Sequence, residues 1–161
     1  MTVRPDGTVR HDMVVDLPAE QAFWRFADLD KIKPREHNMR SAAIAETVLE
    51  QQAGGDLYNR GVDCTICRWG RLLSFDPPHT IAFSWDIGPD WQVVSDQATA
   101  GEVEISFAGD ADGRTRVTLV RRHIDRHGGD WESLQAGLHS PNAWPLYLSR
   151  FEALTRDEVA R

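Results

Sequence analysis

The sequence predicts an α+β protein in which a curved antiparallel sheet of about six to seven strands wraps around a long C-terminal helix. Between residues 43 and 123, apolar and polar residues alternate in short runs separated by turn residues, which is typical of a strand meander. After residue 130, apolar residues recur at spacings of three and four, as in an amphipathic helix. Such a helix buries its apolar stripe by lying across one face of the sheet. A chain of 161 residues suits one domain of this kind, spanning 1–161.

The N-terminal part predicts one strand followed by two short helices. Residues Val9–Leu17 alternate weakly and form the first expected strand. Pro18 suits the first turn of a helix, where its missing N–H is not needed, and Phe23 and Phe26 give that helix an apolar stripe. A second short helix is expected over Asp28–Asn38.

Turn residues divide the central part into strands. Gly54 and Gly55 predict a turn with positive φ, and Asp110–Gly113 predicts a hairpin. Pro77 and Pro78 must end a strand because proline cannot donate to the ladder. The expected strands are Ala43–Gln51, Asp56–Asp63, Thr65–Phe75, His79–Ile87, Val103–Phe107 and Thr115–His123, with a long polar connection over Gly88–Gly101.

The C-terminal forty residues predict helices. One segment covers Asp130–Leu138, and Ser140–Asn142, with its proline at position 141, breaks or kinks it. The last helix carries a strongly apolar stripe, formed by Trp144, Tyr147, Leu148, Phe151 and Leu154. In a strongly twisted sheet, the gap between sheet and helix is where a cavity would open.

Composition excludes several classes of function. The net charge of −7, with no run of lysine or arginine, argues against a nucleic-acid partner. No apolar run is long enough to span a bilayer, and Met1–Glu20 lacks the apolar centre of a signal peptide. We therefore expect a cytoplasmic protein whose cysteines are reduced.

No motif predicts a metal, a cofactor or a catalytic residue. Cys64 and Cys67 have the spacing of a half-site, but they fall at a hairpin turn and on a strand, where positions three apart point to opposite faces. His123 and His127 are four apart, yet they span a strand end and a loop rather than one helix. We expect structural or solvated roles for these residues.

Aromatic residues and two arginines are the candidate ligand-binding residues. The set is Tyr58, Arg60, Trp69, Phe83, Trp85, Arg121, Trp144, Tyr147 and Phe151. For any one of the aromatics, ordinary core packing is the alternative. Arg121 shares a strand face with Val117 and Leu119, so it either points inward near a cavity mouth or extends along the strand end to the surface.

Five segments together carry a resemblance to a known family: Gly54–Ile87, Gly88–Gln92, Thr115–Val117, Asp125–Gly128 and Ser140–Trp144. They resemble the Hsp90-ATPase-activator-homologue (AHSA1-type) branch of the START/Bet v 1-like superfamily, also called SRPBCC. The resemblance implies a helix-grip (Bet v 1-like) fold with a hydrophobic cavity between the sheet and the last helix. Members of the wider superfamily bind lipids, sterols or polyketides, and some cyclise polyketides.

The leading hypothesis is a non-enzymatic protein that binds a small hydrophobic or amphipathic molecule in an aromatic cavity, with Arg60, Arg121 or Tyr58 orienting a polar end. A cyclase/dehydratase-like enzyme is an alternative, and it requires an acid–base pair such as Asp86 or Glu104 with His123 or Arg121. Strand alternation places both carboxylates on the faces away from the apolar residues. A module that stimulates an Hsp90-type chaperone ATPase is the other alternative, and it requires an exposed patch.

Overall fold

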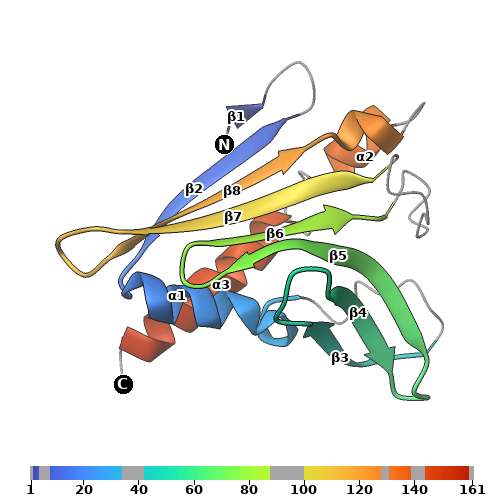
Figure 1. Ribbon diagram of the computed structural model, residues 1–161, viewed down its shortest axis with the longest axis horizontal. Coiled ribbons are helices and arrows are strands. Elements are labelled where there is room, and N and C mark those ends of the chain that lie inside the picture. The colour runs from blue at the N-terminus through green and yellow to red at the C-terminus, as the bar shows by residue number, and fades with distance from the viewer. Residues whose placement is uncertain are drawn as a thin grey trace.

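The computed structural model describes residues 2–3, 8–33, 42–87, 100–127, 131–138 and 144–159. Its strands form one antiparallel sheet in the order β1-β2-β8-β7-β6-β5-β4-β3 (Figure 1). They are β1 (Thr2–Val3), β2 (Val9–Val15), β3 (Ile44–Leu49), β4 (Asp56–Gly61), β5 (Ile66–Asp76), β6 (Thr80–Trp85), β7 (Gly101–Gly109) and β8 (Thr115–Arg122). The sequence therefore predicted the seven long strands and missed only the two-residue edge strand β1.

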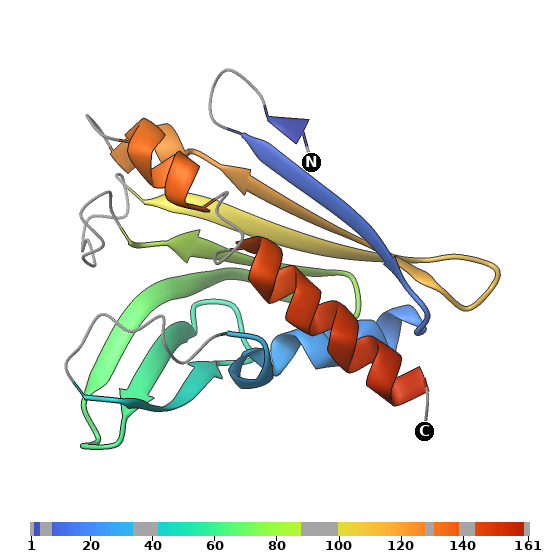
Figure 2. The same cartoon turned by 180° about the vertical axis from the view of Figure 1, so that it is seen from behind.

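The helices are α1 (Ala19–Ala27), η1 (Leu29–Lys31), η3 (Ile124–His127), α2 (Trp131–Leu138) and α3 (Trp144–Val159), where η denotes a 3-10 helix. Figure 2 shows α3 lying across one face of the sheet, with α1 beside it. We call the face of the sheet that α3 covers the inner face. The expected helix–sheet arrangement is confirmed, including the long C-terminal helix that the sheet wraps around.

The second short helix differs from the prediction. In place of a helix over Asp28–Asn38, the described residues contain the single 3-10 turn η1. Leu29 and Ile32 are buried against the core, which holds this turn in place. Proline at position 34 disfavours helical dihedral angles at Lys33, so the turn does not continue there. Residues 34–41 lie outside the described part, as does the connection that carries Trp91.

Turn chemistry agrees with the prediction at both hairpins. Gly54 has φ +82° and Gly113 has φ +76°, in the left-handed region where a side chain would strain the backbone. The first turn joins β3 to β4 and the second joins β7 to β8. Strand register follows from these short connections, so alternation decides which residues face α3.

Apolar residues from the inner face and from the helices form one core. Ile81, Phe83 and Trp85 of β6 alternate toward α3, and α1 contributes Phe23 and Phe26. All five belong to the same buried cluster. The aromatic side chains of this core lie between the sheet and α3, which is the region where the sequence predicts a ligand site.

Candidate ligand site between the sheet and α3

Five aromatic side chains form a continuous cluster between the sheet and α3. They are Trp69 of β5, Phe83 and Trp85 of β6, and Trp144 and Tyr147 of α3. Trp85 lies 5.7 Å from Trp69 and 5.8 Å from Trp144, measured between ring centroids. Trp144 continues to Tyr147 at 4.9 Å. We call these five residues the aromatic cluster.

Both elements hold the aromatic cluster by their own periodicity. Phe83 and Trp85 are two apart on one strand, so they share the inner face. Trp144 and Tyr147 are three apart on one helix, so they share its buried stripe. All five are at most 5% exposed, and this burial brings together residues that are up to 78 positions apart in the sequence.

Polar side chains border the aromatic cluster on the β3–β4 side. Asn59 is buried, and its Oδ1 accepts hydrogen bonds from Thr47 Oγ1 at 3.0 Å and from Trp69 Nε1 at 3.3 Å. The ammonium of Lys33, itself buried, lies 5.8 Å from the ring centroid of Trp69, within the range of a cation–π interaction. The aromatic cluster is therefore not surrounded by apolar groups alone.

Asn59, Thr47 and Lys33 were not among the predicted site residues, although the sequence held a signal for one of them. Asn59 lies between Leu57 and Gly61 on β4, and all three occupy the buried positions of that strand. Alternation could therefore have placed Asn59 on the inner face. Lys33 follows a turn and has no such periodic signal.

Arg121 points into the protein, which decides between the two orientations that the sequence left open. It is 0% exposed, and its cross-strand partners are Val9 on β2 and Val103 on β7, both buried. Burial in these surroundings lowers the pKa of Arg121 to about 10. A charged guanidinium therefore lies on the inner face, two strands away from Phe83.

Tyr58 and Arg60 lie on the opposite face of the sheet from the aromatic cluster. They alternate with buried Asn59 on β4 and are partly exposed. The guanidinium of Arg60 binds the carboxylate of Glu46 at 2.8 Å. The structure thus does not bring these two predicted residues to the aromatic cluster.

Phe151 packs at the other end of α3. Its ring centroid lies 5.4 Å from that of Phe26 in α1, and it is 0% exposed. It shares the buried stripe of α3 with Tyr147, one helical turn earlier. Phe151 therefore extends the core toward α1, beyond the aromatic cluster.

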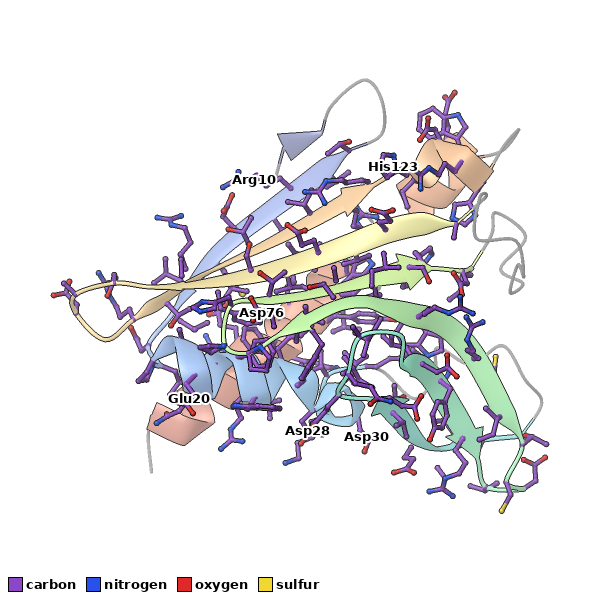
Figure 3. The ribbon with its side chains drawn as sticks, in the orientation of Figure 1. Arg10, Glu20, Asp28, Asp30, Asp76 and His123 are labelled. Carbon is purple, nitrogen blue, oxygen red and sulfur yellow. The ribbon has the colours of Figure 1, made fainter. Side chains whose placement is uncertain are left out.

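The side chains considered for acid–base chemistry are separated. Glu104 forms an ion pair with Arg122 at 3.6 Å. His123 lies at the end of β8 beside η3 (Figure 3), with φ +60° where the chain turns away from the sheet. Asp86 follows β6 on the side away from the cluster, as alternation predicted, yet it is 0% exposed and lies 3.7 Å from Arg68.

His127 replaces a missing strand neighbour at the start of β7. Because β8 ends at Arg122, the backbone N–H of Gly101 donates instead to His127 Nε2 at 3.2 Å. Burial lowers the pKa of His127, and the negative charge of Asp86 and the backbone carbonyl of Trp85 offset part of that effect. The imidazole is thus held as a neutral acceptor.

The two cysteines point to different surroundings, as the spacing predicted. Cys64 is exposed in the β4–β5 turn and Cys67 is buried on β5, and both are free thiols. Within the described ranges, no three histidine, cysteine or acidic side chains gather as a metal site would need. None of the described helices has the length and apolar character needed to cross a bilayer.

No protein-family model matches the chain. Among curated proteins, the FO synthase of Mycobacterium leprae is 40% identical over 53 residues, but the chain spans only about 6% of that protein's length. This match covers 33% of the chain and is therefore local.

Solved structures match over nearly the whole chain. The anthrahydroquino-γ-pyrone synthase Txn09, solved as a complex, is 32% identical with a TM-score of 0.62, over 91% of this chain and 95% of that one. The self-sacrificing resistance protein CalC from Micromonospora echinospora is 23% identical with a TM-score of 0.66, over 95% and 96%. An AHSA1-like protein from Aeromonas hydrophila is 15% identical with a TM-score of 0.57, over 95% and 96%.

The curved antiparallel sheet with a helix across its inner face defines a helix-grip α+β protein. The 32% identity to Txn09 extends over almost all of both chains, so the two proteins belong to one family. The chain belongs to the START/Bet v 1-like (SRPBCC) superfamily. Its likeness to the AHSA1-like protein shows that the two share this fold.

Proposed function

We propose that this protein binds a small hydrophobic or amphipathic molecule among the aromatic side chains between the sheet and α3. The observation that carries the proposal is the aromatic cluster, to which the sheet and the last helix both contribute. Tryptophan and tyrosine offer large apolar faces together with polar edges, which suits a ligand that has both kinds of surface. Burial of apolar ligand surface would supply about 25 cal/mol per Å² before the costs of binding.

Arg121 supports an amphipathic ligand over a purely apolar one. The buried guanidinium of Arg121 has several N–H donors, which suit a carbonyl, carboxylate or phenolate oxygen. Its position on the inner face directs that charge toward the side of the sheet that α3 covers. We expect it to orient the polar end of the ligand.

Tryptophan emission tests this function because three tryptophans belong to the aromatic cluster. Titration with a panel of fatty acids, sterols and polycyclic aromatics is expected to change the emission for at least one class. Trp24, which is 37% exposed, contributes a background that the variant Trp24→Phe removes. Unchanged emission across the panel, together with no bound mass in native mass spectrometry of protein from its own host, would refute the proposal.

A cyclase-like activity is the second candidate, and the 32% identity with the anthrahydroquino-γ-pyrone synthase favours it. A γ-pyrone ring closes when a phenol oxygen attacks the carbonyl of a 1,3-diketone and water leaves. A positive charge near the attacked carbonyl stabilises the oxyanion that develops there. Arg121 is the described inner-face residue that we assign to this role.

Ring closure is measured by incubating the protein with an anthrahydroquinone that carries an unclosed 1,3-diketone side chain. Mass spectrometry would then detect the loss of one water. We expect Arg121→Met to slow ring closure while the ligand still binds. If closure proceeds at the uncatalysed rate in the presence of bound wild-type protein, the protein binds such molecules without converting them.

The chaperone alternative has less support. The AHSA1-like protein from Aeromonas hydrophila is 15% identical, and a likeness at that level extends to the fold alone. An ATPase assay with the host's Hsp90-type protein remains the direct test, and an unchanged rate would end this alternative.

A further inference from the structure

Three buried N–H groups, two in the aromatic cluster and one on the adjoining Asn59, find no hydrogen-bond acceptor among the described residues. They are Nδ2 of Asn59, Nε1 of Trp85 and Nε1 of Trp144. Each of these side chains is at most 3% exposed. A buried donor without an acceptor has lost its hydrogen bonds to water and gained none in return, so a group of such donors indicates that an acceptor is supplied from elsewhere.

The orientation of the Asn59 amide is determined by its neighbours. Indole Nε1 can only donate, so the atom of Asn59 that faces Trp69 Nε1 at 3.3 Å must be the oxygen. The hydroxyl of Thr47 shares that oxygen at 3.0 Å. The amide nitrogen of Asn59 is therefore turned away from both, with its two hydrogens available.

The three donors belong to one contiguous group of side chains. Asn59 binds Trp69, whose ring lies 5.7 Å from that of Trp85, which in turn lies 5.8 Å from that of Trp144. Indole N–H groups cannot accept, and Asn59 has already used its acceptor. Asn59 and the three tryptophans therefore offer hydrogen-bond donors and flat aromatic faces, and the one acceptor among these four side chains, Asn59 Oδ1, is already engaged.

We propose that the ligand is a planar aromatic molecule whose edge carries hydrogen-bond acceptors, that is, carbonyl or ionised hydroxyl oxygens, and that Asn59, Trp85 and Trp144 donate to them. This inference rests on the proposed ligand-binding function and specifies its chemistry. The ligand's rings pack against the aromatic cluster, and its oxygens satisfy the buried donors. A ligand that carried donors at the same edge would place its own N–H or O–H groups against the buried N–H groups of the protein. Such a ligand would leave both sets of donors unsatisfied and is therefore discriminated against.

A matched pair of probes separates the donors from the apolar contacts. Anthracene and 9,10-anthraquinone share one three-ring frame and differ in two carbonyl oxygens. We expect the wild-type protein to bind anthraquinone at least about tenfold more tightly, since each satisfied donor is equivalent to roughly a fivefold gain. Equilibrium dialysis with detection by absorbance measures both probes in the same way.

Tryptophan-to-phenylalanine variants identify the donors. Trp85→Phe and Trp144→Phe keep an aromatic face and remove one N–H each, and neither breaks a hydrogen bond to a described residue. Each is expected to weaken anthraquinone binding about fivefold more than it weakens anthracene binding, since both probes lose the same ring contacts and only anthraquinone loses a hydrogen bond. Trp24→Phe, at a partly exposed position on α1, is the matched control and is expected to change neither affinity.

The outcomes distinguish this inference from the function on which it rests. If both probes bind with equal affinity, or if the variants weaken both equally, the acceptor preference is wrong while ligand binding stands. If neither probe binds, the proposed acceptor preference and the proposed ligand-binding function are both wrong for planar aromatic molecules. The wild-type affinity ratio is decisive even if a variant fails to fold.

Discussion

Replacing Arg121 by methionine separates the stability of the empty protein from its ability to bind. Arg121 is 0% exposed, and burial lowers its pKa to about 10. One pKa unit is equivalent to about 1.4 kcal/mol, so keeping the guanidinium charged costs the folded state on the order of 3 kcal/mol at neutral pH. Methionine has a similar length and no charge. We expect Arg121→Met to raise the free energy of unfolding of the ligand-free protein by about 1–3 kcal/mol.

The pH at which this is measured follows from the direction of the shift. The folded state releases the Arg121 proton more readily than the unfolded state does, so the penalty is present at every pH below about 10. It diminishes only when the pH rises above that value. Urea unfolding at pH 7, followed by far-UV circular dichroism, therefore records the full effect.

A control on the same strand isolates burial as the cause. Arg116 lies on β8 with its side chain exposed, so Arg116→Met is expected to change the free energy of unfolding by less than about 0.5 kcal/mol. Arg121→Met is also expected to weaken binding of an anionic probe such as anthracene-9-carboxylate. A fall in stability of more than about 1 kcal/mol in Arg121→Met would refute the reasoning, because the charge would then stabilise the empty fold.

Three further predictions concern residues around the site. His127→Phe removes the acceptor of the Gly101 N–H and is expected to cost about 1–3 kcal/mol at pH 7.5. Because the pKa of His127 is lowered in the folded state, the neutral imidazole contributes to stability above about pH 6.5, and this contribution is lost as the pH falls below that value. In thermal unfolding, the difference in stability between the variant and the wild type should therefore shrink toward pH 5.5. Thr115→Val removes the buried hydrogen bond of 2.6 Å that the threonine hydroxyl donates to the carbonyl of Leu17. It should lower the free energy of unfolding, measured in urea, by about 1–3 kcal/mol. An unchanged value would mean that another donor replaces the hydroxyl. Arg60→Ala removes an exposed ion pair, so the ligand affinity measured by dialysis and the free energy of unfolding should each stay within about 1 kcal/mol of the wild-type value. A larger loss of affinity would show that Arg60 contributes to ligand binding.

Strand positions could be read from the sequence because they depend on local signals. The seven long strands lie within two residues of the predicted bounds at most ends, since glycines at turns and prolines at strand ends act on their immediate neighbours. The expected helix over Asp28–Asn38 was the exception. Its residues permit a helix, but Leu29 and Ile32 are held by contacts with distant parts of the core.

Site residues divide in the same way. Phe83 and Trp85, like Trp144 and Tyr147, share a face by strand or helix periodicity, so the sequence could place each pair. Tyr58 and Arg60 were selected by residue type alone, although the alternation of β4 sets them opposite Asn59.

The order of the elements, the turns and the face on which most side chains lie all follow from local sequence, because periodicity and backbone preference act within a few residues. Packing between distant elements is what turns Arg121 inward, brings Asn59 to Trp69, and places Trp85 and Trp144 where no described residue accepts from their N–H groups. These features arise where β4, β5, β6 and α3 pack together and where β8 lies between β2 and β7. The distances between residues so far apart in the sequence are set by packing rather than by local preference.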